Sequence, residues 1–114
     1  MRTDNVVAIT HLWQATYMNE LPLIKCGLVD RWMILSSEYH LQVLPDDYVE
    51  FSGRVLCRIT GVRRYDSFAA LLAREDTARI DPDSSAEELL GLWRAKYSPE
   101  QENEGVFIAQ FCVV

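Results

Sequence analysis

Cysteine is scarce in this sequence, and its three copies do not form the patterns that stabilise small secreted domains. Cys26, Cys57 and Cys112 are an odd number, contain no CxxC pair and lie far apart. This pattern argues against a disulfide framework and against a zinc knuckle. Cys57 and Cys112 each lie in an apolar, strand-like run, where a thiol packs as a small hydrophobic group. We therefore expect reduced cysteines, buried at these two positions, in a cytoplasmic protein.

Long apolar runs are also missing. The most apolar stretches, residues 105–109 and 111–114, are far too short to cross a bilayer. The first five residues contain one base and one acid and are not followed by the apolar segment of a signal peptide. The sequence thus predicts no association with a membrane.

Lysine is nearly absent, so the positive charge comes from arginine. Of the 11 basic residues only Lys25 and Lys96 are lysines, and 17 acids bring the net charge to −6. This charge opposes strong sequence-independent binding to nucleic acid, which needs many cations to neutralise phosphates. Arginine, however, binds phosphate and carboxylate through two parallel hydrogen bonds. A local arginine-lined site within an acidic protein is therefore compatible with the composition.

The length and composition predict one globular domain spanning residues 1–114. A chain of 114 residues, 49% of them hydrophobic, is long enough to bury a core without metals or disulfides. There is no repeat, no linker and no glycine-rich loop between alternating strands and helices. A doubly wound nucleotide-binding fold is therefore excluded.

Strand-like alternation occurs in five segments. Residues 45–47 form a turn signal before one of them, and residues 105–114 are apolar on both faces, which predicts a central closing strand. We expect this strand to pair with residues 54–62. The predicted strands are residues 6–9, 29–35, 48–51, 54–65 and 105–114.

Helical patterns separate these strands. Residues 16–26 could form a helix that is interrupted by Pro22 and ended by Gly27. Asp66 or Ser67 can cap a second helix, and two overlapping capping boxes at residues 84–88 open a third, which residues 98–99 end. The order predicts an α+β fold, a small mixed β-barrel with two or three helices packed on it. Its single core would include Val55, Ile59, Phe68, Leu71, Leu89, Trp93, Val106 and Ile108.

Four phrases between residues 11 and 112 resemble the ASCH family of small PUA-like β-barrels. Residues 24–27 resemble its I-x-x-G entry, and residues 44–51 its hydrophobic residue and turn before a strand. Residues 63–68 are similar to the R-Y-x-S-F junction between a strand and a helix. Residues 97–106 are similar to its closing Y-S-x-E and G-V. The resemblance implies a barrel with a cleft used on RNA or nucleosides, because some members hydrolyse acetylated cytidine and others cleave or bind RNA.

The family's reactive residues follow the entry glycine, in a pattern close to G-x-K-T-x-E/T-x-R. Placed on Gly27, this pattern puts the lysine on Val29, the Glu or Thr on Trp32 and the arginine on Ile34. These side chains supply neither a basic amine nor an activated hydroxyl. The resemblance therefore implies a catalytically degenerate, divergent member. A register shifted by two residues would instead bring Asp30 and Arg31 towards these places.

The helical region offers one match to the family. Glu75 alone could occupy the place of the family's glutamate from that region, and it would be catalytic only if the chain is active. We expect no other catalytic residue.

Candidate nucleic-acid contacts are Arg31, Trp32, Arg63, Arg64 and Tyr65. An aromatic residue beside an arginine can stack bases, although filling of the core is the alternative for Trp32. Alternation puts one of the two adjacent arginines on each side of the sheet. One should pair with Asp66 or an acid of the last helix, and the other should contact phosphate or a base.

Metal and cofactor sites are not expected. The only histidines, His11 and His40, favour packing and surface roles respectively. Acidic pairs at residues 46–47 and at positions 81 and 83 lie beside prolines, where they are typical turn formers.

Three functions stay open. The first is a module that binds single-stranded RNA or a nucleotide without chemistry. The second is an adaptor with a closed cleft and a protein partner. The third is a hydrolase of acylated nucleosides or RNA. An open concavity lined by Arg31, Arg63 and Arg64 would favour binding, and a Lys, Thr or Glu reaching it would favour catalysis.

Overall fold

The structure, a computed structural model, describes residues 12–15, 21–36 and 43–114. The strand expected at residues 6–9, the first part of the helix expected at 16–26, and both His11 and His40 lie outside these residues. Five strands are described: β1 (Leu12–Ala15), β2 (Arg31–Leu35), β3 (Tyr48–Phe51), β4 (Val55–Tyr65) and β5 (Val106–Val113). The helices are α1 (Leu21–Lys25), α2 (Phe68–Arg74), the 3₁₀ turn η3 (Thr77–Arg79), α3 (Ala86–Lys96) and α4 (Pro99–Asn103).

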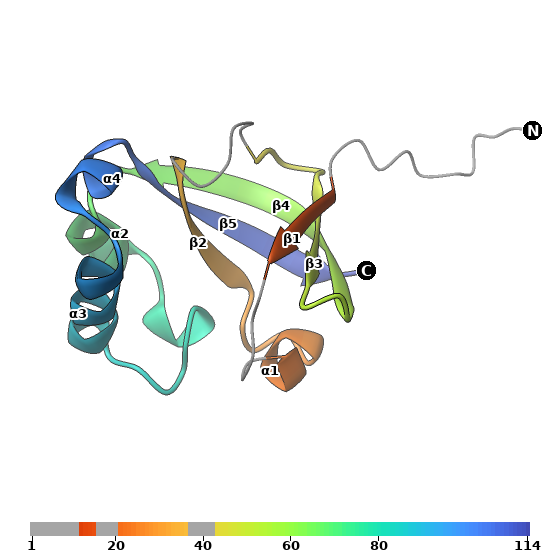
Figure 1. The fold of residues 1–114 in the computed structure, drawn as a ribbon. Helices are drawn as coiled ribbons and strands as arrows, with labels where there is room; N and C mark the ends of the chain where they lie inside the picture. The colour runs from red at the N-terminus through yellow and green to blue at the C-terminus, as the bar shows by residue number, and fades with distance from the viewer. Residues whose placement is uncertain (1–11, 16–20, 37–42) are drawn as a thin grey trace, which may run out of the picture.

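The strands form one curled, mixed sheet in the order β1-β3-β4-β5-β2 (Figure 1). β1 runs parallel to β3, and the other neighbouring pairs are antiparallel. β5 pairs with residues 57–65 of β4 on one side and with all of β2 on the other. The prediction of a central closing strand is therefore confirmed, and so is the α+β class with a barrel-like sheet.

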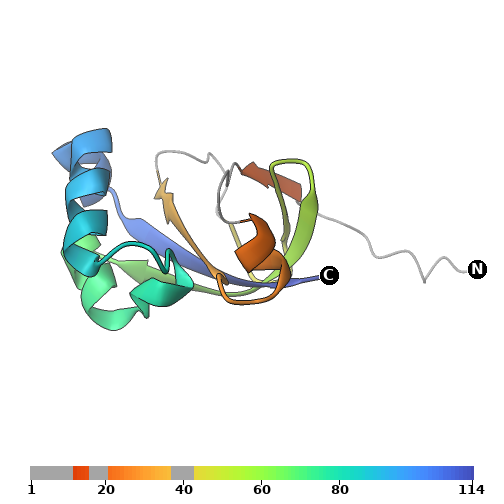
Figure 2. The ribbon, with the colours of Figure 1, turned by 90° about the horizontal axis from the view of Figure 1, so that it is seen from below.

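α2, α3 and α4 lie together at one end of the two long strands, β4 and β5. α1 lies away from them, against the curled part of the sheet (Figure 2). α2 begins where Ser67 accepts a hydrogen bond from the backbone of Ala70, and α3 begins with a capping box between Ser85 and Glu88. α3 ends at Lys96, just before Ser98 and Pro99, as expected, but a further helix that was not expected begins at the same place. Ser98 caps α4, with Pro99 in its first turn, because a missing N–H costs nothing at that position.

The apolar side chains form two clusters, so the expectation of a single core is wrong. Trp32, Ile59 and Phe111 belong to one cluster, inside the curled sheet with α1. Phe68, Leu71, Leu89, Trp93, Val106 and Ile108 belong to the second, where α2 and α3 cover the other face. β5 contributes to both clusters because successive residues of a strand point to opposite faces.

The cysteines follow the sequence prediction in part. Cys57 is fully buried, and burial raises the pKa of its thiol to about 12, so it stays protonated. Cys112 is exposed, contrary to expectation, because β5 passes the edge of the apolar cluster in its last residues.

Candidate functional site

Three neighbouring strands place polar side chains on one face of the sheet. Arg31 of β2 lies opposite Gln110 of β5, and Gln110 lies opposite Gly61 of β4. Two residues along β4 from Gly61 stands Arg63, and two further stands Tyr65. Because side chains alternate with a period of two residues, Arg31, Arg63, Tyr65 and Gln110 share the face that α2 covers.

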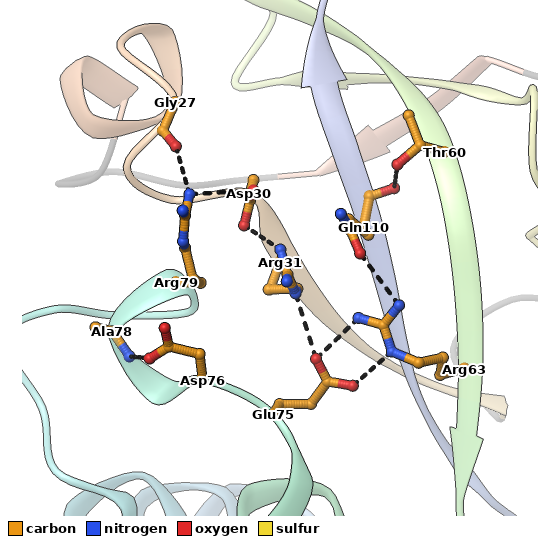
Figure 3. Close-up of polar contacts among 10 residues, drawn as sticks. All are labelled: Gly27, Asp30, Arg31, Thr60, Arg63, Glu75, Asp76, Ala78, Arg79 and Gln110. Carbon is orange, nitrogen blue, oxygen red and sulfur yellow. Dashed lines mark hydrogen bonds and ion pairs between the residues drawn. The ribbon is translucent and has the colours of Figure 1, made fainter.

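Glu75, the residue after α2, joins these side chains. Its side chain is only 4% exposed and points between Arg31 and Arg63 (Figure 3). Nε and Nη2 of Arg63 donate to its two oxygens at 2.7 and 2.9 Å, and Nε of Arg31 donates at 3.3 Å. The hydroxyl of Tyr65 donates to the same carboxylate. We call these four residues the Glu75 cluster.

The carboxylate of Glu75 has no acceptor position to spare. Oε1 accepts from Arg31 and Arg63, and Oε2 accepts from Arg63 and Tyr65. These four bonds use the lone-pair positions that a carboxylate offers. Burial pushes the pKa of Glu75 upwards, but the hydrogen bonds from Arg63 and Tyr65 and the charge of Arg63 hold the pKa below its ordinary value. The group is therefore a stable carboxylate anion.

The pKa values of Arg63 and Tyr65, two partners of Glu75, are both raised. The hydrogen bond to Glu75 raises the pKa of Arg63. Burial, followed by the bond to Glu75, raises the pKa of Tyr65. Both side chains thus keep their protons, and the cluster has one charge state across the neutral range.

A second layer of contacts surrounds the cluster. Nη1 of Arg63 donates to Gln110 at 3.1 Å, and Arg31 also pairs with Asp30. Arg79 of η3 reaches the same Asp30 at 3.3 Å and the carbonyl of Gly27 at 3.0 Å. Three arginines thus meet two carboxylates, which leaves one net positive charge at this face.

Arg64 lies on the opposite face from Arg63, as the alternation predicts. It pairs with Asp66 at 3.2 Å, and both side chains are exposed. A hollow of about 510 Å³ opens beside it, lined by Arg64, Tyr65, Asp66, Ala70, Ala73 and Arg74. The sequence-predicted residues are thus divided: Arg31, Arg63 and Tyr65 meet at Glu75, and Arg64 and Tyr65 line the hollow.

Trp32 packs inside the curled sheet. It is 6% exposed, and its ring meets the ring of Phe51 edge-on, with centroids 5.8 Å apart. Val29 and Ile34, the other positions first matched to the reactive residues, are buried in the same cluster. Asp30 and Arg31, the residues named for a shifted register, lie on the other face, where Arg31 contacts both Glu75 and Asp30.

Sequence reasoning missed three side chains near these sites. Gln110 could have been found, since it is the one polar residue in the apolar run of β5. Arg79 and Arg74 carried no such signal, because an arginine near a helix end is common and only the chain path after α2 brings them close. Within the described ranges no three His, Cys, Asp or Glu residues are grouped to hold a metal ion. The helices described there are too short or too polar for a membrane span.

Comparison with known proteins gives likenesses to solved structures. Neither the protein-family models nor the curated proteins searched give a match. The crystal structure of hypothetical protein PH0355 is 28% identical, with a TM-score of 0.79 over 90% of this chain and 99% of that one. Protein PF0455 from Pyrococcus furiosus is also 28% identical, with a TM-score of 0.73 over 90% of this chain and 97% of that one.

A third likeness carries the name of a fold. The ASCH domain from Lactobacillus crispatus has a TM-score of 0.59 over 89% of this chain and 79% of that one, at 15% identity. At this identity the comparison concerns the fold rather than the chemistry, and the fold of this chain is ASCH-like.

Proposed function

We propose that this chain is a module that binds single-stranded RNA or a nucleotide through phosphate and does not hydrolyse it. The observation that carries the proposal is the Glu75 cluster, in which one buried carboxylate holds two guanidinium groups on the same face of the sheet. Arg63 is 38% exposed, so its outward N–H groups can meet a ligand.

Preorganisation supports binding at this face. An arginine that is already held by Glu75 and Gln110 loses little freedom when it binds a phosphate. Guanidinium groups match phosphate oxygens with parallel hydrogen bonds. Arg79, 44% exposed, adds a third cation on the other side of Asp30.

The same contacts argue against hydrolysis by Glu75. A general base must come within hydrogen-bond reach of the proton that it removes, and a pKa near the working pH makes it efficient. All four acceptor positions of Glu75 are occupied, and its pKa is lowered. The carboxylate therefore serves better as a clamp for arginines than as a base.

A salt titration on an eight-nucleotide single-stranded RNA tests binding. Two or three arginine contacts predict a slope of log affinity against log salt of about −1.5 to −2, with about micromolar affinity at low salt. Arg63→Gln and Arg79→Gln should each reduce the slope by about 0.7. Glutamine removes the charge but retains a donor, so circular dichroism should show both variants folded.

Arg58→Gln is the matched control, because Arg58 lies on the same strand and pairs with the exposed Asp46 at 2.8 Å, away from Glu75. It should leave the slope unchanged. Absence of binding at low salt, or equal loss in all three variants, would contradict the proposal and favour the protein-adaptor alternative. In parallel, the purified chain should not deacetylate acetylated cytidine. Turnover that Glu75→Gln abolishes would show that the chain is a hydrolase.

A further inference from the structure

The hollow beside Arg64 and Tyr65 is a second candidate ligand site. The hollow of about 510 Å³ is bounded by the end of β4 and by α2. Its volume falls within the roughly 300–1,000 Å³ that small-molecule sites occupy. Two of its six lining residues are arginines, Arg64 and Arg74, and Asp66 is the one acid among them.

Neither arginine is strongly neutralised. The side chain of Arg74 forms no ion pair or hydrogen bond with any residue in the part of the chain that the structure describes. Arg64 pairs with Asp66, whose side chain is 92% exposed, and such surface pairs are weak. A doubly charged anion that meets both guanidinium groups would therefore displace only this weak contact.

Arg64 lies against a glycine with an unusual backbone conformation. Gly105 has φ +122°, and a Cβ built on it would lie 3.1 Å from Nε of Arg64 and 3.2 Å from Nη2. The guanidinium group thus lies against the glycine, in space that any other residue would take. The absence of a side chain at Gly105 thus leaves room for the guanidinium group beside the hollow.

The remaining walls are suited to a flat apolar group. Ala70 and Ala73 present only methyl groups along α2, and Tyr65 adds the face or edge of a ring. The hydroxyl of Tyr65 is bonded to Glu75, so the ring has a fixed position. Aromatic rings of this kind stack on nucleobases.

We infer that this hollow binds a nucleoside monophosphate, with the phosphate between Arg64 and Arg74 and the base against Tyr65 and the two alanines. The hollow shares Tyr65 with the Glu75 cluster, but its two cations are different from Arg63 and Arg79, so nucleotide binding there does not depend on RNA binding at the cluster.

Isothermal titration calorimetry with adenosine 5′-monophosphate, adenosine and inorganic phosphate tests this inference. The monophosphate should bind more tightly than either adenosine or phosphate alone. Arg74→Gln and Arg64→Gln should each weaken its binding by about fivefold or more, because each removes a charge-assisted contact. Arg58→Gln, the same change on β4 at a distance, should leave it unchanged.

The outcomes separate this site from the proposed function. Unchanged affinity for the monophosphate in both hollow variants, or no binding at millimolar concentration, overturns the inference. If Arg63→Gln weakens binding of the monophosphate and Arg74→Gln does not, the ligand lies at the Glu75 cluster and the inference is also overturned. A third outcome is that Arg74→Gln loses monophosphate binding and the unaltered chain does not bind the eight-nucleotide RNA. This outcome supports a nucleotide site in the hollow and contradicts the proposed function.

Discussion

Arg63 and Arg64 are neighbours in the sequence but have opposite surroundings. Arg63 donates twice to a carboxylate that is 4% exposed, whereas Arg64 donates once to a carboxylate that is 92% exposed. The strand alternation sends one to the face covered by α2 and the other to the opposite face. The contribution of an arginine–carboxylate ion pair to stability thus depends on the burial of its carboxylate. The buried Glu75 fixes the position of Arg63, whereas the exposed Asp66 leaves Arg64 available to a ligand.

Removing the charge of Glu75 should have the largest effect on the stability of the fold. Glu75→Gln should reduce the free energy of unfolding by about 3 kcal/mol, because two guanidinium groups lose a buried counter-charge. Urea denaturation followed by circular dichroism measures the change. The matched variant Asp66→Asn, which removes the acid of Arg64, should cost at most about 0.5 kcal/mol. Equal costs for the two variants would refute the distinction between the two arginines.

Acid should remove part of the same stabilisation. The pKa of Glu75 lies below the ordinary value of a glutamate, so the folded state keeps its carboxylate ionised where the unfolded chain takes up a proton. This contribution is fully present above pH 4.5 and is lost as the pH falls through the lower, folded pKa. Thermal unfolding from pH 7 to pH 3 should show a steeper fall for the unaltered chain than for Glu75→Gln. Parallel curves would mean that Glu75 is not held as an anion by its partners.

A smaller loss of stability is expected from a change at Gly105, the residue against which Arg64 lies. Gly105→Ala should cost about 1 kcal/mol, because φ +122° is unfavourable for any residue with a Cβ, and the new methyl group meets Arg64. The flexible end of Arg64 can move away, so the fold should persist. Denaturation measures the cost, and the alternative result, no change in stability, would mean that the backbone at this position relaxes freely. Gly91→Ala in α3, where no atom lies within 4 Å of the added Cβ, is the control and should stabilise slightly.

The local elements could be predicted well from the sequence, for reasons that operate within a few residues. Alternation over residues 55–65 and the turn before Tyr48 predicted β4 and β3. The capping residues at 66–67 and the two overlapping capping boxes at 84–88 predicted the starts of α2 and α3, and the structure uses Ser67 and Ser85 as the caps. α4 was missed because a proline that ends one helix is equally suited to begin the next.

The site could be predicted only as a set of candidates. Arg31, Arg63, Arg64, Tyr65 and Glu75 were all singled out, but their arrangement was not. Trp32 was offered beside Arg31 as a stacking residue, yet alternation turned the two side chains to opposite faces and buried the tryptophan. The match of the family's reactive positions to Val29 and Trp32, or in a shifted register to Asp30 and Arg31, stays a prediction, because one sequence contains no signal that fixes such a register.

By itself the sequence determined where β2 to β5, α2 and α3 form, because caps, turns and periodicity act between residues close in the chain. Only the tertiary structure decided that Glu75 holds Arg31, 44 residues away, and Arg63, 12 residues away, on one face of the sheet. It also decided that Arg64 and Arg74 border one hollow. The physical reason is that strand order, register and the packing of α2 on the sheet depend on contacts between distant segments, whose pairing no local pattern specifies.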